Sequence, residues 1–306
     1  MCSPHRLCVT WAVFVAPAYY GVRVEQTKAV IPMRPLTFGE LLDAAVSLLR
    51  VHGPLLLVSA LVLAVCEQAL LYPLRSWAGM TPPLHLPYSE RLGSSWLAFC
   101  AGLATEGAIL ALLGGLTGAA AGPGLLGRPV RGRELLGQVF RRLPALLVVA
   151  VVTAAILLTS SLVMLLPWLF LFGLVGMAGP ALIVDRIGPG RALGRSFRLA
   201  SVGLRGAAIR LGGYVSWTAI RLVLGYAAFG LLQVSLRPGS IIFTVLIMAL
   251  WVLVDSLAYA TLACVDAVLY LETRMRVEGL DIAIGRIRRL GRPVDLAGSA
   301  VLGAAR

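Results

Sequence analysis

The chain has 306 residues, of which 59% are hydrophobic and only 13% are charged. A soluble domain is usually about 45–50% apolar and about 25% charged, so this composition excludes an ordinary soluble protein. A net charge of +13 is also found in nucleic-acid-binding proteins. Here, however, the arginines lie between long apolar stretches. We therefore expect the lipid bilayer and anionic phospholipid headgroups as partners, and no nucleic acid.

The five cysteines and three histidines show no spacing typical of a metal site or a disulfide framework. Cys66, Cys100 and Cys264 lie inside apolar stretches, and no two cysteines have the spacing of metal ligands. HExxH and GxSxG motifs are absent as well. The sequence therefore predicts no metal, no cofactor and no catalytic residue, and a protein that is not an enzyme.

Residues 1–32 differ from the rest, and three interpretations stay open. The apolar stretch 8–22 is shorter than the about 20 residues that a membrane span requires. It has the length of a signal-peptide core, but the charge before it is weak and no cleavage site is clear. We favour Met33 as the true start, with residues 1–32 as a poorly structured or mis-annotated extension.

A helix start follows directly at Thr37. Thr37 and Glu40 have the spacing of a capping box, in which each side chain binds the backbone N–H of the other residue. Apolar residues then recur every three to four positions as far as His52. The pattern predicts an amphipathic helix that lies along the inner membrane surface.

Six apolar segments after this helix are long enough to cross a membrane: about 54–71, about 94–119, two within 143–184, about 211–234, and one from about 241 to beyond 262. Residues 143–184 contain no charged side chain. As a single helix they would be about 63 Å long, twice the membrane core of about 30 Å, so they must form two spans. We expect the turn between these two spans at Pro167–Trp168.

Charge asymmetry predicts the orientation. Segments 33–53, 122–142, 185–210 and 273–306 carry 20 basic residues together, whereas the opposite side carries three. The positive-inside rule places the side with 20 basic residues in the cytoplasm, together with both ends of the core. The predicted fold is an all-α, polytopic membrane bundle of six transmembrane helices over residues 33–290, followed by a flexible cytoplasmic tail at 291–306. We expect it in the plasma membrane.

Three basic amphipathic segments, beginning near Gly39, Arg133 and Arg191, precede the three pairs of spans. The sequence thus predicts three membrane hairpins, each introduced by a surface helix. Small-residue faces within the spans should allow close helix packing: Gly114, Gly118 and Gly122, and Gly173, Gly176 and Gly179. Gly188–Pro189–Gly190 is interpreted as a turn into the third surface helix, because it lacks the spacing of a phosphate loop.

Charged residues deep within spans are costly and are functional candidates by default. The intramembrane candidates are Glu67, Glu106, Arg221, Asp255 and Asp266. Arg221 lies at a depth that would let it pair with one or two of the acids. Two interpretations stay open: a structural ion pair that fixes helix register, or a polar pathway for protons, ions or a lipid headgroup. Asp255, Tyr259, Asp266 and Tyr270 share one helical face, which we expect to pack inward.

Arginines near the spans are candidates for contacts with anionic lipid, each worth about 1 kcal/mol. These are Arg191, Arg195, Arg198, Arg286, Arg288 and Arg289. Farther along the chain, Glu278–Gly279 predicts the bend at which the long sixth helix leaves the membrane.

Three stretches resemble a known family: 34–43 (RPLTFGELLD), 180–186 (PALIVDR) and 270–281 (YLETRMRVEGLD). Together they resemble the glycerophosphoryl diester phosphodiesterase membrane-domain-like proteins of high-GC bacteria, over roughly residues 33–290. In the family's fusion proteins a separate soluble barrel hydrolyses the phosphodiester with a His–Arg pair and metal-binding carboxylates. Here His5–Arg6 stands alone, and no stretch could form a barrel of about 250 residues. The resemblance therefore implies fold and location, and no activity.

Two functions follow as hypotheses. The first is a non-catalytic scaffold, or a partner of another membrane protein, in the bacterial cell envelope. The alternative is a transporter or lipid-handling protein that uses Glu67, Glu106, Arg221 and Asp255. A structure in which the acids contact only Arg221, sealed from water, would argue against transport.

Overall fold

The computed structural model describes residues 30–80, 92–202, 204–237, 240–291 and 293–297. These residues form helices and no strand. Six of the helical segments are long and apolar enough to cross a membrane, which confirms the predicted all-α, multi-pass membrane bundle. The apolar stretch 8–22 and the predicted loop at 81–91 lie outside the described residues.

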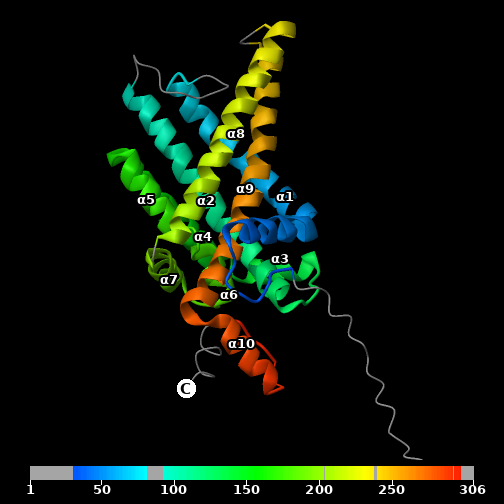
Figure 1. Ribbon diagram of the computed structural model, residues 1–306. Helices are drawn as coiled ribbons and strands as arrows, with labels where there is room; N and C mark the ends of the chain where they lie inside the picture. Colours follow the sequence, from blue (N-terminus) through cyan, green and yellow to red (C-terminus); the bar gives the residue numbers. More distant parts are fainter. Residues whose placement is uncertain (1–29, 81–91, 203, 238–239, 292, 298–306) are drawn as a thin grey trace, which may run out of the picture.

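The helices are α1 (Phe38–Trp77), α2 (Leu92–Leu126), α3 (Gly132–Arg141), α4 (Leu143–Val163), α5 (Leu165–Val175), α6 (Ala178–Val184), α7 (Pro189–Ser201), α8 (Arg205–Ser235), α9 (Ile241–Glu278) and α10 (Leu280–Arg289). Helices α3, α7 and α10 gather at one end of the bundle, at the bottom of Figure 1. We call this end the basic end. The α8–α9 turn lies at the opposite end.

Helix α1 combines the predicted surface helix with the first span. Its capping box is present: the Thr37 side chain accepts a hydrogen bond from the Glu40 N–H, and the Glu40 carboxylate accepts one from the Thr37 N–H. His52 has non-helical dihedral angles (φ −114°, ψ 18°) just before Pro54. Proline cannot donate to the preceding turn, which accounts for the kink. The segment before the kink crosses the bundle, and the rest of α1 rises along it (Figure 1).

The break between the third and fourth spans lies three residues before its predicted position. Met164 is extended (φ −168°, ψ 154°) and separates α4 from α5. Pro167 instead lies in the first turn of α5. Backbone N–H groups in a first turn have no partner within the helix, so proline there removes no hydrogen bond. Trp168 is 2% exposed and packs against Phe172 and Tyr214, so the predicted turn at Pro167–Trp168 is wrong.

The fourth span is itself interrupted between α5 and α6, at Gly176–Met177. A break inside a membrane protein must have its backbone groups satisfied by other protein groups. The Ser196 hydroxyl of α7 donates to the Leu174 carbonyl at 2.6 Å and accepts from the Met177 N–H at 3.1 Å. The Arg210 guanidinium of α8 donates to the Phe172 carbonyl. Helices α7 and α8 thus stabilise the broken span.

Glycines allow the close contacts between α2 and α6, as their small-residue faces predict. A Cβ on Gly118 would lie 2.8 Å from the Cα of Pro180, and a Cβ on Gly179 would lie 2.2 Å from the Ala111 carbonyl oxygen. Both approaches are too short for any side chain. Glycine at these positions therefore lets the two backbones touch.

The half of α9 nearest the basic end is the buried centre of the fold. Its face with Asp255, Tyr259, Asp266 and Tyr270 is at most 4% exposed, as the predicted inward stripe requires. The helix ends at Glu278, and Gly279 adopts a left-handed conformation (φ 63°, ψ 37°) that starts α10. The predicted bend is therefore present, with glycine where a positive φ requires it.

Short segments at both ends of the described chain pack onto the bundle. Ile31 is fully buried, and the Val30 N–H donates to the Gly124 carbonyl at 3.1 Å. Val294 and Leu296 are also buried, and the Leu296 carbonyl accepts from Arg274 at 3.1 Å. Residues 293–297 therefore pack against the protein, where the sequence predicts a flexible tail.

Replacing Gly179 with alanine should destabilise the fold by about 1–3 kcal/mol, because the added methyl group would overlap the Ala111 carbonyl oxygen. The midpoint of thermal unfolding in detergent measures this effect. Gly137→Ala is the matched control, because a Cβ at Gly137 in α3 meets nothing within 4 Å. Equal midpoints for the two variants would contradict the packing account.

Candidate functional site

Helices α8 and α9 form an antiparallel pair joined by three arginine–carboxylate contacts, which we call the ladder. Arg205 Nη1 lies 2.7 Å from a Glu272 carboxylate oxygen, and Arg210 Nε lies 2.8 Å from Asp266. Nearest the α8–α9 turn, Arg221 Nε lies 3.2 Å from Asp255. Every arginine of the ladder is on α8 and every acid is on α9.

The middle contact of the ladder was missed from the sequence, although a pattern could have revealed it. Arg210 and Arg221 are 11 residues apart, and so are Asp255 and Asp266. Eleven residues make about three helical turns, so equal intervals on two antiparallel helices bring both pairs into register together. The sequence assigned Arg210 to a basic segment outside the membrane and left Asp266 without a partner.

The four principal candidates meet in one place. We call Glu67, Glu106, Arg221 and Asp255 the mid-membrane cluster. Arg221 Nη1 donates to Glu106 at 2.5 Å, in addition to its contact with Asp255. The predicted pairing of Arg221 with one or two acids is thus confirmed. The Tyr214 hydroxyl also donates to Glu106, at 2.6 Å, and holds that carboxylate from α8.

Glu67 is held differently from the other two acids of the cluster. It is 4% exposed and, among the described residues, makes no ion pair. The Tyr259 hydroxyl donates to Glu67 Oε2 at 2.6 Å, and the Thr105 hydroxyl lies 2.7 Å from Oε1. The acids therefore do not contact Arg221 alone, and Glu67 has only neutral partners.

The Thr105 hydroxyl has two acceptors but only one proton. It lies 2.7 Å from Glu67 Oε1 and 2.9 Å from the Gly102 carbonyl oxygen. If Glu67 is ionised, the hydroxyl donates to the carboxylate and leaves the carbonyl without its proton. If Glu67 carries a proton, Glu67 donates to Thr105 and Thr105 donates to Gly102. Both protonation states of Glu67 thus have a hydrogen-bonded arrangement.

A chain of polar groups extends from the cluster toward the end opposite the basic end. Arg75, in the last turn of α1, donates to Gln68 Oε1 at 2.7 Å. Gln68 in turn donates to Asp255 Oδ2 at 3.4 Å. Glu106 retains 16% side-chain exposure. In the opposite direction Arg210 and Asp266 are 3% and 1% exposed, and the Arg210 guanidinium stacks 3.8 Å from the Phe172 ring centroid.

Not every atom of the cluster is satisfied. Arg221 Nη2 is buried and has no hydrogen-bond partner within the part of the chain that the structure describes. An unpaired guanidinium N–H inside a protein is unfavourable by about 1–3 kcal/mol or more. The mid-membrane cluster therefore leaves part of the hydrogen-bonding capacity of Arg221 unused.

A second network lies at the basic end and uses Asp185, Arg195, Tyr270, Arg274 and Glu278. Asp185 accepts from Arg274 at 2.7 Å and from the Tyr270 hydroxyl at 2.5 Å. Burial raises the pKa of Asp185, while the Arg274 guanidinium and the Tyr270 hydroxyl act in the opposite direction. Arg195 lies 2.5 Å from Asp185 and 2.7 Å from Glu278, and its side chain is 12% exposed.

Arg195 therefore points into the protein, and we no longer expect it to contact lipid. The remaining candidate lipid contacts are exposed residues of the basic end, as the sequence predicts: Arg191, Arg198, Arg286, Arg288 and Arg289. Arg198 lies 4.0 Å from Glu278, and its side chain is 68% exposed. Their role as lipid contacts stays a prediction.

Among the described residues no group of His, Cys, Asp and Glu has the geometry to hold a metal ion. No family model, no curated protein and no solved structure matches the chain. The site is therefore interpreted from its own geometry.

The ladder predicts a specific stability pattern. Arg210→Met leaves Asp266 buried without its cation, which should be unfavourable by about 3–5 kcal/mol. Replacing both partners, as Arg210→Met with Asp266→Leu, should recover most of this loss, because no buried charge remains. Unfolding midpoints of the two single variants and the double variant measure the coupling; strictly additive shifts would contradict a direct ion pair.

Proposed function

We propose that this chain is a proton-coupled membrane transporter whose mid-membrane cluster binds and releases a proton. The observation that carries the proposal is the imbalance of charge at the cluster. Three carboxylic acids converge there, and the cation Arg221 contacts two of them, Glu106 and Asp255. With all three ionised, the cluster would hold uncompensated negative charge inside the membrane, which is unfavourable by several kcal/mol. A proton compensates this charge.

Glu67 is the position we assign to the exchangeable proton. Its partners are the neutral hydroxyls of Thr105 and Tyr259, whereas Glu106 and Asp255 contact Arg221. Thr105 accommodates either state by turning its single O–H bond between Glu67 and the Gly102 carbonyl. A site that releases a proton reversibly needs two such states of similar free energy.

The polar side chains around the cluster are distributed asymmetrically. The polar chain through Gln68 and Arg75 leads toward the end opposite the basic end. Toward the basic end, the buried Arg210–Asp266 pair and the aromatic group of Trp168, Phe172 and Tyr214 are packed against each other. Transporters that alternate access open one side at a time, and we assign the polar side of the cluster to proton entry.

The first hypothesis, a non-catalytic scaffold, is favoured by a different observation. Arg210 and Asp266 form a one-to-one pair, and Glu272 is paired with both Arg205 and Arg276, each at 2.7 Å. Such saturated pairs fix helix register without any exchange of protons. A scaffold would therefore show no charge movement when the pH changes.

Orientation and family membership complete the proposal. We place the basic end in the cytoplasm of a bacterial plasma membrane, because the positive-inside rule assigns the arginine-rich side there. We also propose membership of the glycerophosphoryl diester phosphodiesterase membrane-domain-like family, with its fold and location and without phosphodiester hydrolysis. The three stretches quoted from the sequence support this assignment.

Charge movement after a pH jump tests the proposal. The full chain is reconstituted in liposomes that are adsorbed on a solid-supported membrane, and the pH is stepped between 8 and 6. The wild-type protein should give a transient current, because protons enter the membrane to reach Glu67. Glu67→Gln should abolish most of this current, since the amide binds no exchangeable proton.

Glu134→Gln is the matched control, because Glu134 is exposed on α3. Its current should equal that of the wild type. A wild-type current no larger than that of protein-free liposomes, or a full current from Glu67→Gln, would reject proton binding at the cluster. The scaffold hypothesis would then be preferred.

A further inference from the structure

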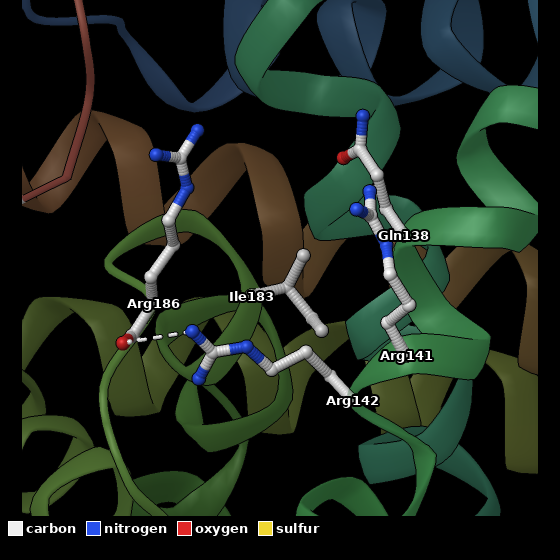
Figure 2. Close-up of a pocket in the computed structure, with 5 residues that line it drawn as sticks. All are labelled: Gln138, Arg141, Arg142, Ile183 and Arg186. Atoms are coloured by element: carbon white, nitrogen blue, oxygen red, sulfur yellow. Dashed lines mark hydrogen bonds between the residues drawn. The ribbon is translucent and has the colours of Figure 1, made fainter.

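A cavity opens at the basic end between α3 and the end of α6 (Figure 2). Its volume is about 450 Å³. Gln138 and Arg141 line it from α3, Arg142 from the junction with α4, and Ile183 and Arg186 from the last turn of α6 and the loop after it. Three of the five lining side chains are therefore arginines. The sequence patterns described above did not single out this group.

The backbone at the cavity is held in an unusual conformation. Arg186 has a positive φ of 54°, a backbone conformation that residues other than glycine rarely adopt. Arg142 holds this turn by donating to the Arg186 carbonyl at 3.2 Å (Figure 2). It also donates to the Ile187 carbonyl, at 3.3 Å. Conformations of this kind are found at ligand sites, where surrounding contacts maintain them. Here the contact is made by another residue of the same cavity.

The charge of the cavity selects an anionic ligand. Asp295 is the acid that contacts its arginines in the described part of the chain, at 3.2 Å from Arg186. This pair is largely solvent-exposed, with 63% and 47% side-chain exposure, so its contribution is small. Arg141 and Arg142 add two further positive charges. Guanidinium groups bind phosphate oxygens through paired, charge-assisted hydrogen bonds.

A neighbouring cavity of about 270 Å³ gives the site an apolar side. It shares Gln138, Ile183 and Arg186 with the first cavity, and it adds Arg128 and the segment 294–296, which contains Asp295. Small and apolar residues of α2 complete its lining: Gly118, Ala119, Gly122, Pro123 and Leu126. The first cavity lies where α4 begins and α6 ends, and the second lies where α2 and α6 end. The site thus offers arginines beside an apolar slot.

We propose that these two cavities form one binding site for the phosphate group of a phosphate ester. The arginines bind the phosphate oxygens, and the apolar slot of α2 takes the carbon chain attached to them. This chemistry has two sources: the headgroup of an anionic phospholipid, or a soluble organic phosphate. The site shares no residue with the mid-membrane cluster and is independent of the proposed proton binding.

Two binding experiments on the full chain in detergent distinguish the sources. In the first, native mass spectrometry follows the binding of phosphatidylglycerol, with phosphatidylcholine as the comparison lipid. In the second, isothermal titration calorimetry measures glycerol 3-phosphate and inorganic phosphate. The proposal expects binding in at least one of the experiments. Arg141→Gln combined with Arg186→Asn should weaken it by about tenfold or more, as expected for the loss of charge-assisted hydrogen bonds.

The variants are chosen to keep the fold. Asparagine tolerates a positive φ, and Arg141 is exposed at the end of α3, so neither change disturbs the core. Arg141→Gln alone decides the test if the double variant does not fold. Arg133→Gln is the matched control, because Arg133 is exposed on α3 and does not line either cavity. It should bind like the wild type.

Binding of phosphatidylglycerol over phosphatidylcholine, lost in the double variant and kept in the control, assigns the site to a lipid headgroup. Binding of glycerol 3-phosphate with the same dependence assigns it to a soluble ester. Inorganic phosphate should bind more weakly than either ester, because it leaves the apolar slot empty. The absence of binding in both experiments, or equal binding by the wild type and the double variant, would overturn the proposal.

Discussion

The high free energy of a lone charge in an apolar membrane determines how this bundle is organised. Helix α8 carries Arg210 and Arg221 inside its candidate span. An arginine without a carboxylate partner there would raise the free energy of the folded protein by several kcal/mol, and each of the two has one. Helix α9 supplies Asp266 and Asp255 at the same 11-residue interval. This matched interval fixes both the register and the facing sides of the two helices. Helices α1 and α2 then pack against α9, whose inner half is almost completely buried, and α4 packs against α2.

Features set by local rules could be predicted from the sequence. The capping box at Thr37 and the left-handed Gly279 depend on a few neighbouring residues, and the spans depend on apolar length alone. The pairing of Arg221 could also be predicted, because an isolated charge at that depth requires a partner. The break at Met164 could not, since no glycine or proline at that position indicates it. Arg210 was missed because only its partner on α9 shows that it lies within the bundle.

The interrupted fourth span shows that buried backbone groups, like buried charges, need partners within the protein. The break at Gly176–Met177 is stabilised by one hydroxyl, from Ser196, and one guanidinium, from Arg210. Arg210 therefore serves the ladder and the broken helix together, within van der Waals reach of Gly176. A side chain at Gly176 would displace this guanidinium from both partners. The ion pair, the aromatic group around Phe172 and the broken span are thus one structural unit on the side of the cluster that faces the basic end.

The ladder also bears on how the protein enters the membrane during synthesis. Of the six candidate spans, α8 has the lowest mean hydropathy, 1.5, and an arginine at the centre of an isolated helix disfavours insertion by about 2.5–3.5 kcal/mol. Helix α9 begins only a few residues after α8 ends and carries the matching acids. The two helices therefore gain most by leaving the translocon together, already paired. Because only residues 236–240 separate the two helices in the sequence, the acids follow the arginines closely as the chain is made.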